Sequence, residues 1–437
     1  MKKILLLFTF ISGFYLNAQT WTEQNTGYPV DGSYTGDISI VDANVVWTMV
    51  QRTSTTNHQT YGKSTNGGTT WTTGTINVGN TTGLGIGNIT ASDANTAWVS
   101  VFPTTTALGT QGVYKTTNGG ATWTKQTTAA FTSASFVNFV HFWDANNGVC
   151  MGDKKNGYFE IYTTTNGGTT WTRTPTGNIA ASTTDYGYTG KFYVKGNTVW
   201  FGTDGGQLMR STNRGLNWTT INTPIADFGG GTVATSVGEF AFKDDNNGVI
   251  QQTVSNTFYV TTDGGANWTT VPTTGMFWGA IDYAGADMLV SAGSTTGNFG
   301  SSYSLDNGTT WTAIDALSHT TVEFLNATVG FGGGFTGTGT GVGGIFKFNN
   351  TLKNSQFISS KFSMYPNPTN SVINISNNDD IVMNTISISD INGRTVKQVK
   401  VDNVNSTQIN VSELSSGIYF MNISTDSGNA VKKFIKN

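Results

Sequence analysis

Cysteine, proline and charge are all scarce in this 437-residue sequence. Cys150 is the single cysteine, so the chain has no internal disulfide, and its apolar neighbours indicate a buried thiol. Only 7 residues are proline, which argues against a proline-rich disordered chain. Charged residues make up 11% and the formal net charge is −3, which excludes a strongly basic surface. We therefore expect no nucleic-acid partner.

Glycine and aromatic residues are abundant instead. The sequence holds 55 glycines and 12% aromatic residues, and threonine is frequent. This composition favours short strands joined by tight turns. The length allows one large core and a second module. The expected fold class is therefore all-β.

The N-terminus has the pattern of a secretory signal. Lys2 and Lys3 precede an apolar run at 4–16, and Ala18 offers a small residue for cleavage. A retained membrane anchor is the alternative, but the run is shorter than the ~20 residues that span a bilayer. We expect residues 1–18 to be a signal peptide and the mature protein to have no transmembrane segment.

One eight-residue phrase recurs six times at intervals of 43 to 52 residues. A period near fifty that contains four short β segments predicts a propeller blade. We expect the polar third residue to bond backbone amides across a hairpin turn and the final tryptophan to pack the hairpin onto its sheet. These pairs are Asn66 and Trp71, Asn118 and Trp123, Asn166 and Trp171, Asn213 and Trp218, Asp263 and Trp268, and Asp306 and Trp311.

A second phrase predicts the number of blades. It begins at Asp42, Asp93, Asp144, Lys195, Asp244, Gly285 and Asn326, one copy more than the first phrase. The segment around Trp21 matches that around Trp123, so it can supply the missing outer strand. We expect residues 19–356 to form a seven-bladed β-propeller closed by its N-terminal strand. The alternative is a six-bladed ring with additional structure at one end.

The eight-residue phrase resembles the Asp-box of sialidase-like propellers. Residues 201–213, rich in glycine, resemble the propellers of photosystem II assembly factors. The resemblance implies the propeller fold and a structural phrase that lies away from the active face. It implies hardly any function, since propellers host unrelated activities.

The sequence pattern changes near residue 357, where three short motifs follow in order. They are Tyr365, Pro366, Asn367 and Pro368, then Gly417, Ile418 and Tyr419, and finally Lys432, Lys433 and Phe434. The segment 357–437 resembles the type A C-terminal sorting domain of the type IX secretion system of Bacteroidetes-like bacteria. This resemblance implies a small Ig-like β-sandwich, recognition by the outer-membrane secretion machinery, and later removal or exchange for a surface anchor. An ordinary Ig-like adhesion domain is the alternative.

Propeller ligands usually lie over the central channel. Counting five residues back from each second phrase predicts the mouth positions Asp37, Asn88, Phe139, Gly190, Glu239, Ala280 and Thr321. The two carboxylates, Asp37 and Glu239, could act as the acid and base of an inverting glycosidase, which stand ~6.5 to 9.5 Å apart. Two solvated acids at strand starts are the alternative. A sialidase needs an arginine clamp, for which Arg52, Arg173, Arg210 and Arg214 are too few and badly placed.

The three histidines, His58, His141 and His319, lack the short spacing of a zinc site. We expect no metal and no cofactor.

Aromatic residues near the predicted mouth suit stacking on sugar rings or docking of a protein. Packing in the core is the competing interpretation for each of them. They are Tyr34, Tyr186, Tyr188, Phe228, Phe277 and Trp278.

The predicted function is that of a secreted or cell-surface, non-enzymatic binding or adhesion protein for a glycan or a protein. A secreted glycoside hydrolase at the channel mouth is the alternative, and an assembly factor for another exported protein is a third possibility.

Overall fold

The computed structural model describes residues 20–28, 32–52, 59–79, 83–104, 111–131, 135–181, 186–229, 238–337, 343–349, 361–377, 381–425 and 428–437. The predicted signal peptide at 1–18, His58 and the predicted domain boundary at 356 lie outside these residues. The chain divides into two compact units, one of Thr20–Asn349 and one that contains Asn350–Asn437.

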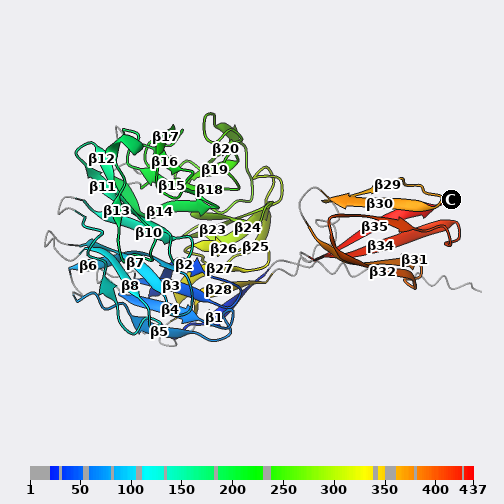
Figure 1. The fold of residues 1–437 in the computed structure, drawn as a ribbon, viewed down its shortest axis with the longest axis horizontal. Coiled ribbons are helices and arrows are strands. Elements are labelled where there is room, and N and C mark those ends of the chain that lie inside the picture. Colours follow the sequence, from blue (N-terminus) through cyan, green and yellow to red (C-terminus); the bar gives the residue numbers. More distant parts are fainter. Residues whose placement is uncertain are drawn as a thin grey trace, which may run out of the picture. The chain divides into compact units, whose positions relative to one another are not determined.

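Strands make up almost all of the regular structure, so the prediction of an all-β chain is confirmed (Figure 1). Helix is nearly absent from the described residues, where the 3-10 turn η1 spans Thr176–Asn178. No helix in this part of the chain has the length and apolar character needed to cross a membrane.

Five sheets of the first unit each hold four antiparallel strands in chain order. They are β6 (Leu84–Ala91), β7 (Ala97–Pro103), β8 (Gly112–Thr116) and β9 (Thr124–Lys125); β10 (Val137–Phe142), β11 (Gly148–Lys155), β12 (Tyr158–Thr164) and β13 (Thr172–Arg173); β14 (Gly187–Lys195), β15 (Thr198–Thr203), β16 (Gln207–Ser211) and β17 (Thr219–Asn222); β18 (Gly238–Phe242), β19 (Gly248–Gln252), β20 (Thr257–Thr261) and β21 (Thr269–Val271); and β22 (Ala280–Ala284), β23 (Met288–Thr295), β24 (Asn298–Ser304) and β25 (Thr312–Asp315).

A further sheet has two four-stranded parts that join at the single pair Tyr34 and Phe335. The first part contains β2 (Ser33–Ile40), β3 (Val46–Arg52), β4 (Thr60–Ser64) and β5 (Thr72–Thr75), and the second contains β26 (Val322–Phe324), β27 (Gly330–Thr336), β28 (Gly343–Asn349) and β1 (Thr20–Asn25). In the second part the N-terminal strand β1 pairs with β28, with Trp21 opposite Phe348.

The turn between the first two strands of a sheet is set by the second phrase. Asp42 Oδ1 accepts hydrogen bonds from the amides of Asn44 and Val45, at 2.7 and 2.8 Å. Asp93 makes the same two bonds to Asn95 and Thr96. An aspartate that bonds to amides two and three residues further on stabilises a tight turn.

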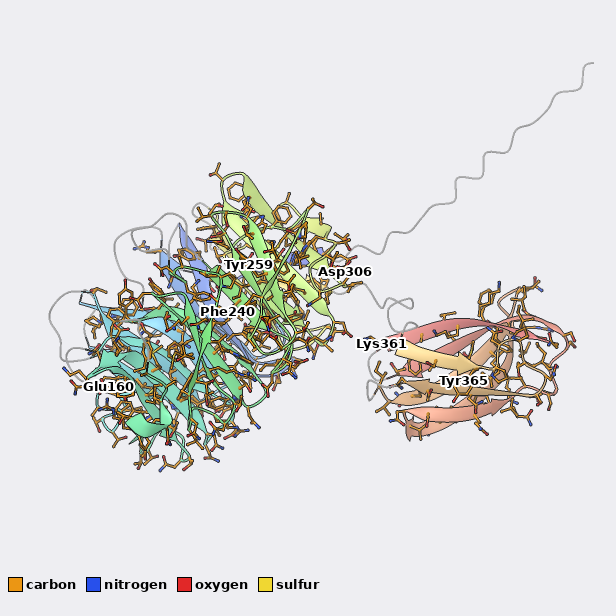
Figure 2. All side chains as sticks on the ribbon, turned by 90° about the horizontal axis from the view of Figure 1, so that it is seen from above. Glu160, Phe240, Tyr259, Asp306, Lys361 and Tyr365 are labelled. Carbon is orange, nitrogen blue, oxygen red and sulfur yellow. The ribbon has the colours of Figure 1, made fainter. Side chains whose placement is uncertain are left out.

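The apolar core of this unit lies between neighbouring sheets. One cluster packs Trp47 of β3 against Val99 of β7, and another packs Trp200 of β15 against Phe242 of β18. A cluster of Ile38, Val46, Phe331 and Ile345 likewise joins the two parts of the eight-stranded sheet. The first strands also contact one another in the order β2, β6, β10, β14, β18, β22, β26 and back to β2. Figure 2 shows how densely side chains fill this unit, with Phe240 of β18 among them.

The second unit contains two antiparallel sheets that share one apolar core. Phe362 and Ile373 come from one sheet, while Ile386, Met421 and Phe434 come from the other. The first sheet has β29 (Phe362–Tyr365), β30 (Val372–Asn377) and β33 (Ser406–Asn410), and the second has β32 (Thr395–Val404), β31 (Met383–Asp390), β34 (Gly417–Thr425) and β35 (Gly428–Lys436).

Candidate functional site

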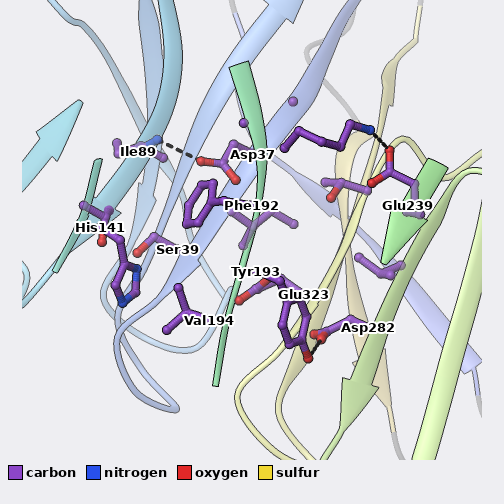
Figure 3. A pocket seen from close by; sticks show the side chains of 18 of the residues that line it. Asp37, Ser39, Ile89, His141, Phe192, Tyr193, Val194, Glu239, Asp282 and Glu323 are labelled. Atoms are coloured by element: carbon purple, nitrogen blue, oxygen red, sulfur yellow. Dashed lines mark hydrogen bonds and ion pairs between the residues drawn. The ribbon is translucent and has the colours of Figure 1, made fainter. Parts of the chain in front are cut away.

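The first strands of all the sheets in the propeller unit line a cavity of about 590 Å³ (Figure 3). We call this cavity the central channel. Its wall carries four carboxyl groups and two ammonium groups, together with aromatic and small residues. The charged residues are Asp37, Glu239, Asp282, Glu323, Lys191 and Lys195.

Asp37 is bound to the neighbouring sheet. Its Oδ2 accepts a 2.8 Å hydrogen bond from the amide of Ile89 on β6. Burial raises the pKa of Asp37 to about 7, although the bond from Ile89 opposes the shift. A large fraction of this carboxyl is therefore protonated near neutral pH.

Asp282 is the most enclosed of the four acids. Its Oδ1 accepts bonds from the hydroxyl of Tyr193, at 2.8 Å, and the amide of Tyr283, while Oδ2 accepts from the amide of Phe324. Burial raises the pKa of Asp282 to about 6, and burial together with the Asp282 charge raises that of Tyr193 well above its usual value.

The remaining acids differ in their partners. Glu239 forms an ion pair with Lys191. Glu323 lines the channel from β26 with a solvent-accessible side chain; the loss of bulk hydration inside the channel and the nearby charges of Asp282 and Asp37 raise its pKa well above the usual range. Lys195 opposes that shift. Three carboxyl groups of the channel therefore favour the protonated form more than a free side chain would.

The structure places five of the seven counted mouth positions in the channel lining. Asp37, Gly190, Glu239, Ala280 and Thr321 line the channel. Asp37 and Glu239 do not contact the same partner: Asp37 accepts a hydrogen bond from the Ile89 amide, and Glu239 forms an ion pair with Lys191.

Asn88 and Phe139 are corrections to that count, because both side chains are buried outside the channel lining. The Asn88 amide bonds to both backbone groups of Val140 on the next sheet. Phe139 stacks on Phe192, with ring centroids 4.5 Å apart.

None of the six aromatic residues predicted for ligand contact lines the channel. For Phe228 the prediction was wrong, because its side chain is fully buried in the core. Phe277 and Trp278 are partly buried, and Trp278 packs against the core beside β22.

The predicted tyrosines are less enclosed. Tyr34 bonds to Gln51 and contacts the Phe335 ring. Tyr188 donates a 2.6 Å bond to Asp227, and Tyr186, 41% exposed, meets its ring edge to face. Ligand contact stays a prediction for these tyrosines.

The eight-residue phrases form closely similar turns. In each copy the polar third residue accepts a bond from the amide four residues later, at 2.8 to 2.9 Å. The second glycine position donates to the Ser or Thr that starts the phrase, at 2.8 to 3.0 Å. Trp123, Trp171 and Trp218 are buried, and the other three tryptophans are partly buried.

A basic residue that was not predicted from the sequence reaches from one sheet to the turn of the next. Lys63 Nζ lies 4.7 Å from the Trp47 ring and donates to the carbonyls of Ala94 and Gly119, both at 3.0 Å. Lys115 repeats the arrangement, over Trp98 and toward the Gly167 carbonyl. A lysine sixteen or seventeen residues after a tryptophan of the second strand was the available signal.

The two histidines among the described residues, His141 and His319, do not lie together in a metal site. His141 lines the channel, and burial, with a smaller effect of Arg214, lowers its pKa to about 3. His319 is buried and bonds to Asp315 at 2.9 Å. Within the ranges that the structure describes, no three His, Cys, Asp or Glu residues are grouped to hold a metal. The channel lining in these ranges also contains no arginine.

The three motifs of the C-terminal unit meet at β35. Ile418 and Tyr419 of β34 lie opposite Ile435 and Phe434, and Tyr419 stacks on Phe434. The Asn367 side chain covers the other edge of β35, since it donates to the Lys433 carbonyl and accepts from the Ile435 amide. Pro366 and Pro368 flank that asparagine.

Comparisons with known proteins agree with this geometry. Residues 363–437 match the family described as the secretion system C-terminal sorting domain. The chain therefore carries a type IX sorting domain, which implies a secreted or cell-surface protein. No curated protein matches the chain.

The solved structures that resemble this chain include two of YCF48. YCF48 from Cyanidioschyzon merolae has a TM-score of 0.53 and 16% identity, with 76% of this chain and 99% of that one covered. YCF48 bound to D1 peptide has a TM-score of 0.52 and 14% identity, with coverage of 76% and 96%. At these identities the likeness shows the fold alone, which is a β-propeller.

Proposed function

We propose that the propeller has seven blades and that β1 completes the last one. The proposal is supported by the closed order of contacts among the first strands, from β2 through β26 and back to β2. Pairing of β1 with β28 leaves no long sheet edge at the closure. The C-terminal unit would then be the Ig-like sandwich that a sorting domain implies, recognised by the type IX machinery and afterwards removed or exchanged.

We infer that the exported propeller binds a ligand in its central channel without changing it chemically. One observation carries this inference: most of the wall's carboxyl groups already have protein partners. Asp37 accepts from Ile89, Asp282 from Tyr193 and two amides, and Glu239 from Lys191. Such groups shape and polarise a cavity, but they are badly placed to move protons on a substrate.

The excess of acids over lysines in the wall favours a ligand with a positive charge. Four carboxyl groups face two ammonium groups, and a bound cation would stabilise the ionised acids. Glu323 and Lys195 have no ion-pair partner within 4 Å among the described residues, so Glu323 is the best candidate for the contact. We therefore favour a basic segment of a protein, in the manner of a propeller captured with a peptide such as YCF48 with D1 peptide.

The test is a titration of the full mature chain with a fluorescent lysine- and arginine-containing peptide and, in parallel, with neutral oligosaccharides. Glu323→Gln should weaken peptide binding roughly tenfold, the loss of about one charged contact. Glu23→Gln, the same change on β1 outside the channel lining, should leave it unchanged. Binding of oligosaccharides alone would move the proposal to a glycan ligand, and equal binding by both variants would refute the channel site.

Glycoside hydrolysis is the second candidate, and the raised pKa of Asp37 favours it. A carboxyl with a pKa of about 7 suits a general acid, and Glu239 could supply the second carboxylate. Incubation with mixed polysaccharides should then release new reducing ends, and Asp37→Asn should abolish them. Absence of new reducing ends, or equal release by the variant, would count against this candidate.

A further inference from the structure

The C-terminal unit exposes an apolar patch on one face of its four-stranded sheet. Ile418 and Phe420 of β34 are 41% and 37% exposed, and Val431 and Ile435 of β35 are 39% and 40% exposed. Ile418 lies directly opposite Ile435, and Phe420 lies opposite Lys433. We call these five residues the outer patch.

The fold itself does not need the outer patch. Successive residues of a strand point to opposite faces of the sheet. Tyr419, Met421 and Phe434 point to the other face and are buried in the core. The exposed residues that alternate with them add little to that core, and exposed apolar clusters of this kind are typical of interaction surfaces.

The charge on this face has one sign. Lys433 lies within the outer patch. Lys400 of β32 is also exposed and lies on the same face, because it is opposite Thr385 of β31, which in turn is opposite Ser424 of β34. Among the side chains of this face that the structure describes, none is a carboxylate. A second copy of the face would bring lysine against lysine, so an acidic partner fits better than a symmetric dimer.

We propose that the outer patch is the surface by which the secretion machinery recognises this chain. The partner is a protein component of the outer-membrane translocon with an apolar groove and an acidic rim. The patch lies wholly within residues 363–437, the segment that matches a sorting domain. This inference rests on the export part of the proposed function and adds the surface that is read.

The test follows export of the full chain in a bacterium that has a type IX system. Ile418→Ser combined with Ile435→Ser should reduce the exported fraction roughly tenfold, as expected when central contacts of an interface are removed. Lys433→Glu should reduce it in the same direction. The matched control is Ile391→Ser, an exposed isoleucine in the turn between β31 and β32. Each purified variant should melt at the same temperature as the parent.

Two comparisons separate the possible failures. Deletion of Asp426–Asn437 removes all of β35, and normal export of that chain would refute the sorting function itself. Normal export of Lys433→Glu, with unchanged melting, would refute the outer patch alone, even if the double variant proved unstable. A parent dimer that the double variant abolishes, detected by sedimentation, would assign the patch to a second copy and overturn the proposal.

Discussion

The hydroxyl of Tyr193 donates a 2.8 Å hydrogen bond to Oδ1 of Asp282, although the two residues belong to sheets that are not neighbours. Tyr193 lies on β14 and Asp282 on β22, with the sheet of β18 between them. Figure 3 shows the bond beside Glu323 at the channel wall. The contact therefore ties distant parts of the ring together through the channel.

Replacing Tyr193 with phenylalanine should destabilise the propeller by about 1 to 3 kcal/mol, because it removes one donor from a buried carboxyl. The remaining bonds from Tyr283 and Phe324 would still hold Asp282. Urea denaturation of the full mature chain measures the change. Tyr259→Phe, on β20, is the control for loss of a tyrosine hydroxyl. Equal stability of the two variants would contradict a structural role for the bond.

Asp37 should make stability fall as the pH rises. Its pKa is about 7 in the folded protein and 3.8 ordinarily, so the folded state binds the proton more tightly than the unfolded state. The stabilisation is complete below the ordinary pKa and is lost as pH rises toward about 7. Asp37→Asn removes this dependence, so the parent should lose stability relative to the variant between about pH 4 and about pH 8.

Asp263 provides a control of opposite sign. Hydrogen bonds with Asn267 lower its pKa to about 2, so its stabilisation is present above pH 3.8 and is lost at lower pH. The parent and Asp263→Asn should therefore keep a constant difference above about pH 5. Asparagine already occupies the equivalent place at Asn66, so the turn accepts it. If the stability difference between parent and variant changed with pH in the same way for Asp37→Asn and Asp263→Asn, the interpretation of Asp37 would be wrong.

Lys63 should contribute to the contact between the first two sheets. Lys63→Met keeps the aliphatic stem near Trp47 but removes two hydrogen bonds to the carbonyls of Ala94 and Gly119. We expect a loss of about 1 to 3 kcal/mol in the free energy of unfolding, typical for bonds from a charged donor. Lys155→Met at the end of β11 should cost less. A smaller loss of stability in Lys63→Met than in Lys155→Met would contradict this role of Lys63 between the two sheets.

The local turns could be predicted because their partners lie within a few residues. The polar side chain of Asn66 bonds to the amide of Thr70, four residues away, and the same spacing recurs in every copy. The carbonyl that Lys63 reaches at Gly119 lies 56 residues away on another sheet, so no local pattern specifies it. Arg214 and Asn307 adopt positive φ where other copies have glycine, which the sequence also did not reveal.

The channel lining was predictable in part. Counting residues found Asp37 and Glu239 because both lie on a first strand, five residues before a second phrase. It failed at Phe139, whose ring turns toward Phe192 on the next sheet instead of the channel. Asp282 and Glu323 were missed because the count considered one position per sheet. Which side chain faces the channel depends on packing between sheets, and single-sequence spacing does not contain that information.

Asn367 should stabilise the sorting domain through the edge of β35. Its amide makes one bond to the Lys433 carbonyl at 3.1 Å and one from the Ile435 amide at 2.9 Å. Asn367→Ala leaves both backbone groups to water, and the expected cost is about 1 to 2 kcal/mol because the site is exposed. Asn392→Ala, in the turn after β31, is the control. Hydrogen exchange at the Ile435 amide should accelerate in Asn367→Ala only, because opening of this edge exposes that donor while the core around Phe434 stays closed.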